Sequence, residues 1–342
     1  MRSRIPIILG LTAAFSLLMA GVVWFSFQRE RPQPADVSVR AEAEKGDAQA
    51  QYTLGRIYDK AKGVPQDEAQ ALVWYRKAAD QGNDDAQFSL GVMYEKGRGV
   101  PQDYAQALAW YRKVADQGDA RAEFNLGSMY DKGRGVPQDY AQATAWFAKA
   151  ANRGAARAQA KLGLRYVEGR GVPQDDAQAV VWLRKAAEQG DASTSAQFNL
   201  GLMYEKGRGV PQDYPQAVAW YRKAAEQGNA EAQLALGRAH EGPGVPRDYA
   251  ESVRWYREAA EQGDPEAQFN LGRMYFNGRG VPQDSVQAHR WANLASARTS
   301  AEKQAEYAKL RDTIAARMTP PQLAEAEKLA RDWTDIFEGR KK

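Results

Sequence analysis

Tryptophan recurs in this chain at a nearly constant interval, and that period constrains the fold more than any other feature. The series is Trp74, Trp110, Trp146, Trp182, Trp220, Trp255 and Trp291. Successive members are 36, 36, 36, 38, 35 and 36 residues apart, and a valine–proline pair precedes each of them. Self-similarity with a period of about 20–50 residues is the signature of a repeat protein. The sequence therefore predicts seven copies of one unit.

The first half of each unit has the pattern of an amphipathic helix. In the third unit, Ala122, Leu126 and Tyr130 follow one another at four-residue spacing, which places them on one face of a helix over 120–132. The segment 133–137 contains two glycines and a valine–proline pair. Glycine accepts the left-handed conformation after a helix and proline cannot continue one, so the helix is predicted to end there.

The second half of each unit is predicted to be a helix that begins at an aspartate. In the third unit, Asp139 is followed three residues later by Gln142, which is a variant of the capping box, and Gly154 ends the helix. Because the same pair returns along the chain, we interpret these carboxylates as helix caps and not as catalytic groups. The other pairs are Asp67/Gln70, Asp103/Gln106, Asp175/Gln178, Asp213/Gln216 and Asp284/Gln287.

One pattern recurs with substitutions in every unit. In the second unit it reads Leu90-Gly91, Tyr94, Gly97, Gly99-Val100, Asp103, Ala107, Trp110, Ala115 and Gly118. Units with this pattern resemble the Sel1-like repeat (SLR) family, a relative of the tetratricopeptide repeat. The resemblance covers about residues 48–297 and implies a right-handed superhelix of antiparallel helix pairs with a scaffolding or adaptor role.

Two units depart from the period. The fifth follows a two-residue insertion near Ser193-Thr194-Ser195, which is expected only to lengthen a loop. The sixth lacks one residue in the segment 240–244 and has His240 where its neighbours have tyrosine, so we expect its turn to have a different shape.

The N-terminal segment 1–27 is predicted to be a transmembrane anchor. Arg2 and Arg4 precede an uncharged stretch over 5–27, which at ~1.5 Å per helical residue can cross a bilayer core of ~30 Å. The stretch ends in bulky residues that include Trp24, which favours an uncleaved anchor over a signal peptide. We expect an inner-membrane protein whose repeats face the periplasm; the alternative is release into the periplasm after cleavage.

The rest of the chain divides into three parts. Residues 28–40 lack apolar periodicity and are interpreted as a spacer, and residues 41–297 hold the seven repeats. Residues 298–342 abandon the period and are predicted to form two capping helices, one over 301–318 and one that starts at Thr319. The fold class is therefore an all-α solenoid with an N-terminal transmembrane helix and C-terminal caps.

Composition excludes several functions. The chain has 47 Lys and Arg against 43 Asp and Glu, interleaved along its length, which is typical of a solvated surface and not of a nucleic-acid footprint. With no cysteine and only His240 and His289, it lacks the usual parts of a metal centre or a hydrolase. Both histidines are interpreted as packed, hydrogen-bonded residues. We expect no enzyme activity, no cofactor, no metal and no small-molecule substrate.

The Gly-Arg-Gly turns before the Val-Pro pairs could suggest phosphate cradles. Proline removes a backbone donor that such a cradle would use, so we interpret the turns as helix ends. Their arginines are expected to form a solvated row balanced by nearby carboxylates. The arginines are Arg98, Arg134, Arg170, Arg208 and Arg279.

An aromatic row is the strongest functional signal. On a helical wheel, Phe124 falls at ~200° from Ala122, away from the core face. Similarity to tetratricopeptide stacks implies that this position lines the concave surface, where aromatic and asparagine side chains could bind a peptide. Alternatively, the row seals the seam between repeats. The candidate binding residues are Tyr52, Phe88, Phe124, Asn125, Phe198, Asn199, Phe269, Asn270 and Arg273, with Leu234 and Ala160 at the same row position.

Three functions remain open at this point. The first is a membrane-anchored scaffold of the bacterial envelope that binds a protein or peptide on its concave face. The second is an immunity or regulatory protein that neutralises a secreted enzyme. A cell-wall hydrolase ranks last, because the chain lacks the cysteines of the relatives for which such activity is claimed.

Overall fold

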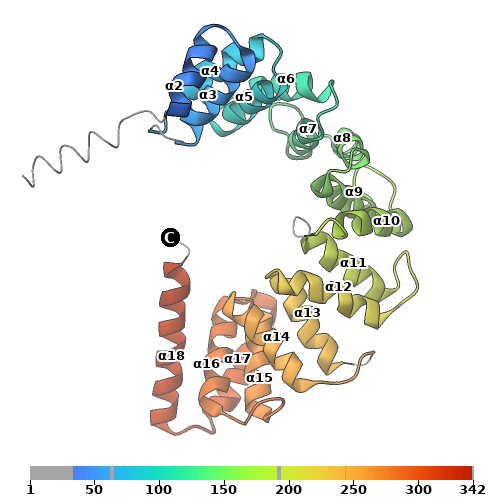
Figure 1. Cartoon of the computed structure of the whole chain (residues 1–342). Coiled ribbons are helices and arrows are strands. Elements are labelled where there is room, and N and C mark those ends of the chain that lie inside the picture. Colours follow the sequence, from blue (N-terminus) through green and yellow to red (C-terminus); the bar gives the residue numbers. More distant parts are fainter. Residues whose placement is uncertain (1–33, 62–64, 191–193, 243, 341–342) are drawn as a thin grey trace, which may run out of the picture. The chain divides into compact units, whose positions relative to one another are not determined.

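The computed structural model describes residues 34–61, 65–190, 194–242 and 244–340, and every element of secondary structure in them is an α-helix. These residues fall into two compact units, which are described one at a time. The first unit ends at Asp139 and contains α2 (Pro34–Glu44), α3 (Ala48–Asp59), α4 (Glu68–Asp80), α5 (Asp84–Lys96), α6 (Tyr104–Ala115) and α7 (Ala120–Lys132) (Figure 1).

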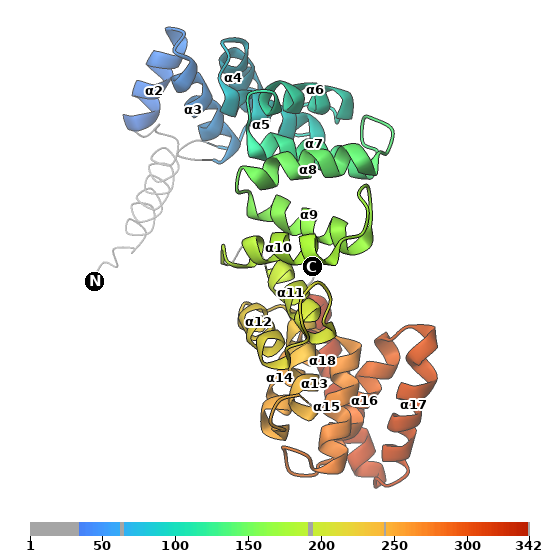
Figure 2. The ribbon, with the colours of Figure 1, turned by 90° about the vertical axis from the view of Figure 1, so that its right-hand side faces the viewer.

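The second unit begins at Tyr140 and contains both the later repeats and the C-terminal caps. Figure 2 shows α15, α16 and α17 side by side in this unit, and α16 also packs against α18. Its helices are α8 (Tyr140–Asn152), α9 (Ala156–Glu168), α10 (Asp176–Ala187), α11 (Thr194–Lys206), α12 (Tyr214–Glu226), α13 (Ala230–Glu241), α14 (Tyr249–Glu261), α15 (Pro265–Asn277), α16 (Ser285–Arg298), α17 (Ala301–Ala315) and α18 (Pro320–Gly339).

The predicted helix signals are confirmed. The first helix of the third repeat occupies 120–132 and is ended by Gly133 in the left-handed conformation, with φ 62°. Aspartate side chains cap the second helices: Asp213, for example, accepts from the backbone nitrogen of Gln216 at 2.9 Å. Thr319 and Gln322 form a capping box at the start of α18.

The spacer expected over 28–40 is wrong for its second half, because α2 begins at Pro34. This helix copies the second helix of a repeat. Arg40 donates to the Tyr58 hydroxyl as Arg112 does to Tyr130, and the Ala43 carbonyl accepts from a buried glutamine as the corresponding carbonyls do elsewhere. The segment lacks tryptophan and apolar periodicity, so its sequence does not show the repeat pattern. It covers the open face of the first repeat.

Within the described residues, no helix has both the length and the apolar character needed to cross a bilayer. The anchor predicted over 1–27 lies outside those residues.

A glycine–tyrosine contact joins the two helices of most repeats. A Cβ atom added to Gly91 would lie only 2.6 Å from the ring of Tyr111, so glycine is what lets α5 and α6 approach. Tyr111 is fully buried, and its hydroxyl donates to the Glu95 carboxylate at 2.8 Å. Equivalent close contacts pair Gly55 with Tyr75, Gly201 with Tyr221 and Gly237 with Tyr256.

Candidate functional site

The aromatic row lies on the first helices and packs mainly within its own repeats. The rings of Phe88 and Tyr111 have centroids 5.6 Å apart, and those of Phe198 and Tyr221 are 5.7 Å apart. The row side chains stay half-buried in α3, α5, α7, α11 and α15, whereas Leu234 in α13 is buried. One side of each stacked ring therefore rests on a tyrosine of the second helix of its repeat.

Three repeats lack this tyrosine: the third has Phe147 in its place, and the other two show that the row residue and its supporting residue are matched. In the fourth repeat, the small Ala160 accompanies Leu183 in place of tyrosine. In the seventh repeat, Ala292 stands where the tyrosine would be, and Phe269 stacks instead on Tyr307 of α17, with centroids 4.3 Å apart. The first capping helix thus supplies the ring that the last repeat lacks.

Other groups cover part of the row in the first unit. The Arg121 guanidinium lies 4.7 Å from the centre of the Phe88 ring and forms salt bridges with Asp85 at 2.7 Å and Asp119 at 2.6 Å. The hydrogen bonds that Arg121 donates to Asp119 and Asp85 raise the pKa of Arg121 above its ordinary value. Phe88 therefore lies beneath an ion-pair network that involves the next repeat.

The polar residues predicted to bind a partner are engaged inside the protein. Asn125 is hydrogen-bonded to the Tyr111 hydroxyl, and Asn199 donates to the carbonyl of Ser195 at 2.8 Å. Asn270 is buried, and Arg273 donates to Glu241 at 2.5 Å. Each of these four side chains is therefore either bonded to another part of the protein or buried.

The row opens into a hollow in the second unit, which we call the α11–α13 groove. It has a volume of about 540 Å³ and lies among α11, α12, α13 and the start of α15. Its apolar lining includes Phe198, Leu202 and Leu234. The sequence prediction did not include Leu202, although it lies one helical turn after Phe198. Arg273, which was predicted, has the same spacing from Phe269.

Carboxylates dominate the rim of the groove. The lining includes Glu205, Glu231, Asp264 and Glu266 against the cations Lys206 and Arg238. Burial works against ionisation of Glu266, but hydrogen bonds from Lys303 and Arg238 outweigh it and hold the pKa of Glu266 below its ordinary value. Glu231 is exposed and belongs to no salt bridge in the described part of the chain. An incoming cation would therefore meet at least one available carboxylate.

Seven segments of the chain match the Sel1 repeat, namely 48–83, 84–119, 120–154, 156–191, 194–229, 230–264 and 265–300. The chain belongs to the Sel1 repeat family. Its repeats agree in number and order with the predicted units. The fold is typical of non-catalytic protein-interaction scaffolds.

Solved structures of Sel1 repeat proteins are similar to this chain. One from Oxalobacter formigenes is 36% identical, with a TM-score of 0.65, over 79% of this chain and 78% of that one. The protein c5321, described as a protective antigen of uropathogenic Escherichia coli with an SLR fold, is 32% identical over 89% of this chain and 79% of its own, with a TM-score of 0.47. No curated protein shows a significant match.

The Gly-Arg-Gly turns of these Sel1 repeats have a structural role, as expected. Arg98 donates to Asp59 and Glu68 of the preceding repeat, the latter at 2.7 Å. Arg208 likewise pairs with Asp176 at 2.7 Å. In these two turns the arginine thereby ties one repeat to the one before it and is paired with carboxylates.

The two histidines lie in different repeats, His240 in α13 and His289 in α16. His289 is buried in α16, and His240 is half-buried. The hydrogen bonds expected for them are missing at three ring nitrogens: both nitrogens of His240 and Nδ1 of His289 are buried without a partner. In the part of the chain that the structure describes, no group of three or more His, Cys, Asp and Glu residues could hold a metal ion.

Burial of His289 predicts a pH-dependent stability. Desolvation lowers its pKa below the ordinary value of 6.5, so the unfolded chain binds the proton more readily than the folded one. Stability from this residue is complete above pH 6.5 and falls as the pH drops from 6.5 towards the folded-state pKa. We expect the melting temperature of the native chain to decrease as the pH is lowered through this window. The melting temperature of a His289→Gln variant should change less. An equal slope in both would contradict this assignment.

Proposed function

We propose that this Sel1 repeat protein is a scaffold that binds a segment of another protein in the α11–α13 groove. The observation that carries the proposal is the position of Phe198 and Leu234, two members of the aromatic row, in the lining of a 540 Å³ hollow. A few side chains in well-packed pockets, aromatic ones prominent among them, supply most of the binding energy in protein interfaces. The carboxylate rim favours a segment in which a basic residue lies next to an apolar one.

The proposal includes the cellular setting predicted from the N-terminal sequence. Residues 1–27 anchor the chain in the inner membrane, and the repeats lie in the periplasm. Support comes from the uncharged stretch over 5–27 that follows Arg2 and Arg4. Membrane fractions washed with alkaline carbonate should retain the full chain and release a chain that begins at residue 28. Release of both would refute the anchor.

Two matched phenylalanines provide the test of the groove. Phe88 and Phe198 occupy the same repeat position and stack on equivalent tyrosines, but only Phe198 lines the hollow. Alanine at either position should lower stability by a similar amount. Only Phe198→Ala should weaken capture of the partner from a detergent extract, by about 30-fold if Phe198 contributes about 2 kcal/mol to binding.

The outcomes separate the possible roles. Equal loss of capture in both variants would mean that the row is purely structural and would refute the groove. Selective loss in Phe198→Ala, with several envelope proteins captured, supports the scaffold. Selective loss with a single secreted enzyme bound in a one-to-one ratio would instead indicate the immunity role.

A further inference from the structure

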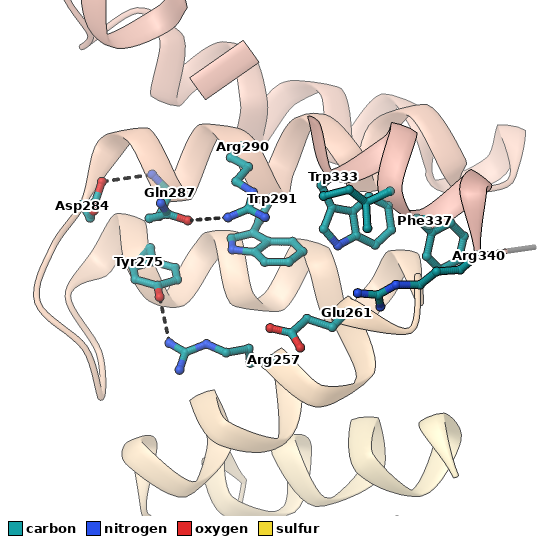
Figure 3. Close-up of a pocket in the computed structure, with 11 residues that line it drawn as sticks. Arg257, Glu261, Tyr275, Asp284, Gln287, Arg290, Trp291, Trp333, Phe337 and Arg340 are labelled. Atoms are coloured by element: carbon teal, nitrogen blue, oxygen red, sulfur yellow. Dashed lines mark hydrogen bonds between the residues drawn. The ribbon is translucent and has the colours of Figure 1, made fainter. Parts of the chain in front are cut away.

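A second hollow of about 540 Å³ lies at the C-terminal end of the array, and we call it the C-terminal pocket. It is lined by residues of α14, α15, α16 and α18 and of the loop before α16, and by Arg340 directly after α18 (Figure 3). Trp291 and Trp333 meet edge to face with centroids 6.3 Å apart, and Trp333 stacks on Phe337 at 4.6 Å. The pocket therefore has an aromatic lining.

The last helix fixes the far wall of this pocket. Phe337 packs against Gly263, where an added Cβ would lie 2.6 Å from the ring, so α18 is held close to the turn between α14 and α15. Arg298 lies over the same ring, 4.3 Å from its centre. Ile336 nevertheless remains 57% exposed at the pocket edge. A helix that only capped the array would not need this apolar side chain at an open edge.

Arginine surrounds the aromatic lining. Arg257, Arg290 and Arg340 line the pocket (Figure 3). The Arg290 guanidinium lies 4.6 Å from the Trp291 ring centre and donates through one terminal nitrogen to Gln287 at 3.2 Å, but its Nε is buried without a partner. Burial lowers the pKa of Arg290 below its ordinary value. A half-buried cation with an unmet donor is costly unless an acceptor arrives.

Neither carboxylate of the pocket accepts a hydrogen bond from the Arg290 Nε. Asp284 is occupied as the cap of α16, where it accepts from the backbone nitrogen of Gln287 at 3.0 Å. Glu261 is exposed and has no hydrogen bond or salt bridge within the described residues. The pocket therefore presents three guanidinium groups against one available carboxylate, the opposite balance from the α11–α13 groove.

The arginine beside the tryptophan is a feature of the last two repeats. In the first five repeats, a lysine three residues after the tryptophan lies over its ring, as Lys149 does over Trp146 at 3.8 Å. In the last two, the cation is the arginine directly before the tryptophan, Arg254 or Arg290. Arg254 lies outside the pocket and pairs with Glu251 at 3.5 Å, so it is a matched control for Arg290.

We propose that the C-terminal pocket is a second docking site, for a protein segment in which an acidic side chain lies next to a bulky apolar one. The carboxylate pairs with Arg290 and Arg257, and the apolar side chain packs on Trp333 and Ile336. Charge complementarity selects this occupant: the guanidinium groups accept an anion, and the aromatic rings accept its apolar neighbour.

A random peptide library displayed on phage tests the proposal without a known partner. The full-length chain in detergent and its Arg290→Gln variant are screened in parallel, and an enriched peptide is synthesised for fluorescence anisotropy. We expect enrichment of acidic residues beside Leu, Phe or Trp with the native chain only. Arg290→Gln should weaken binding of that peptide about tenfold, whereas Arg254→Gln should leave it within about twofold.

Two further variants keep the test decisive if Arg290→Gln unfolds. Ile336→Ala changes an exposed side chain and should also weaken the peptide, and Glu261→Gln removes the competing carboxylate and should strengthen it. The proposal is overturned if no acidic motif is enriched, if Ile336→Ala and a folded Arg290→Gln bind like the native chain, or if Glu261→Gln weakens binding. Because none of these residues lines the α11–α13 groove, the result is independent of the function proposed for that groove.

Discussion

Replacement of Tyr111 by alanine is expected to destabilise the first unit by about 3–5 kcal/mol, as is typical for large aromatic residues in a core. Tyr111 is fully buried and supports both Phe88 and the close approach of Gly91. Its loss would leave a cavity between α5 and α6 and remove a hydrogen-bond donor from Glu95. In a repeat array, this damage also weakens the interfaces with neighbouring repeats.

Tyr111→Phe separates the hydroxyl from the ring. It keeps the stack with Phe88 and removes the hydrogen bonds of the hydroxyl with Glu95 and Asn125, so we expect a smaller loss of about 1–2 kcal/mol. Urea unfolding followed by circular dichroism would rank the variants. Hydrogen exchange should show faster exchange in α5 and α6 of Tyr111→Ala than in the native chain. Equal stability of the alanine variant and the native chain would refute the role given to this ring.

The sequence predicted the repeats because each repeat uses the same local signals. Asp213 and Gly133 act where single-sequence reasoning placed them, since a cap or a left-handed helix end depends only on nearby residues. The insertion before the fifth repeat lengthens the loop and leaves the packing of the flanking helices unchanged at one buried hydrogen bond. Gln197 still donates to the Ala187 carbonyl, now ten residues earlier where other repeats have eight. The irregular sixth turn also differs as expected, because Gly242 is extended.

The sites could be predicted only in part, because they depend on contacts between helices that lie far apart in sequence. The wheel placed Phe124 and its counterparts away from the core face, but it could not show that a tyrosine of the second helix supports the ring in several repeats. Nor could it show that Asn199 is occupied by Ser195. The C-terminal pocket was missed for a related reason. Its aromatic lining joins Trp291 of the last repeat to Trp333 of a segment outside the period.

Gly280→Ala is expected to be the most damaging single-methyl change among the turn glycines of the last repeat. Gly280 has φ 73°, and an added Cβ would collide with the carbonyl oxygen of Tyr249 and lie 2.9 Å from the backbone nitrogen of Ala250. Both atoms belong to the start of α14 in the preceding repeat, and backbone cannot move aside as a flexible side chain can. Strain from the positive φ and from overpacking together should cost about 3 kcal/mol or more.

Gly278→Ala is the matched control, because it has the cost of the left-handed conformation without the close approach to another repeat. The difference between the two variants therefore measures that close approach. Gly278 has a similar φ of 65°, but its added Cβ would make only an ordinary contact, 3.4 Å from the Cβ of Gln283. We expect this variant to lose about 1–2 kcal/mol from the conformation alone. Urea unfolding of both variants measures the difference. If they were equally stable, the second glycine of the turn would be retained for its φ angle only, and the turn would not set how closely adjacent Sel1 repeats pack.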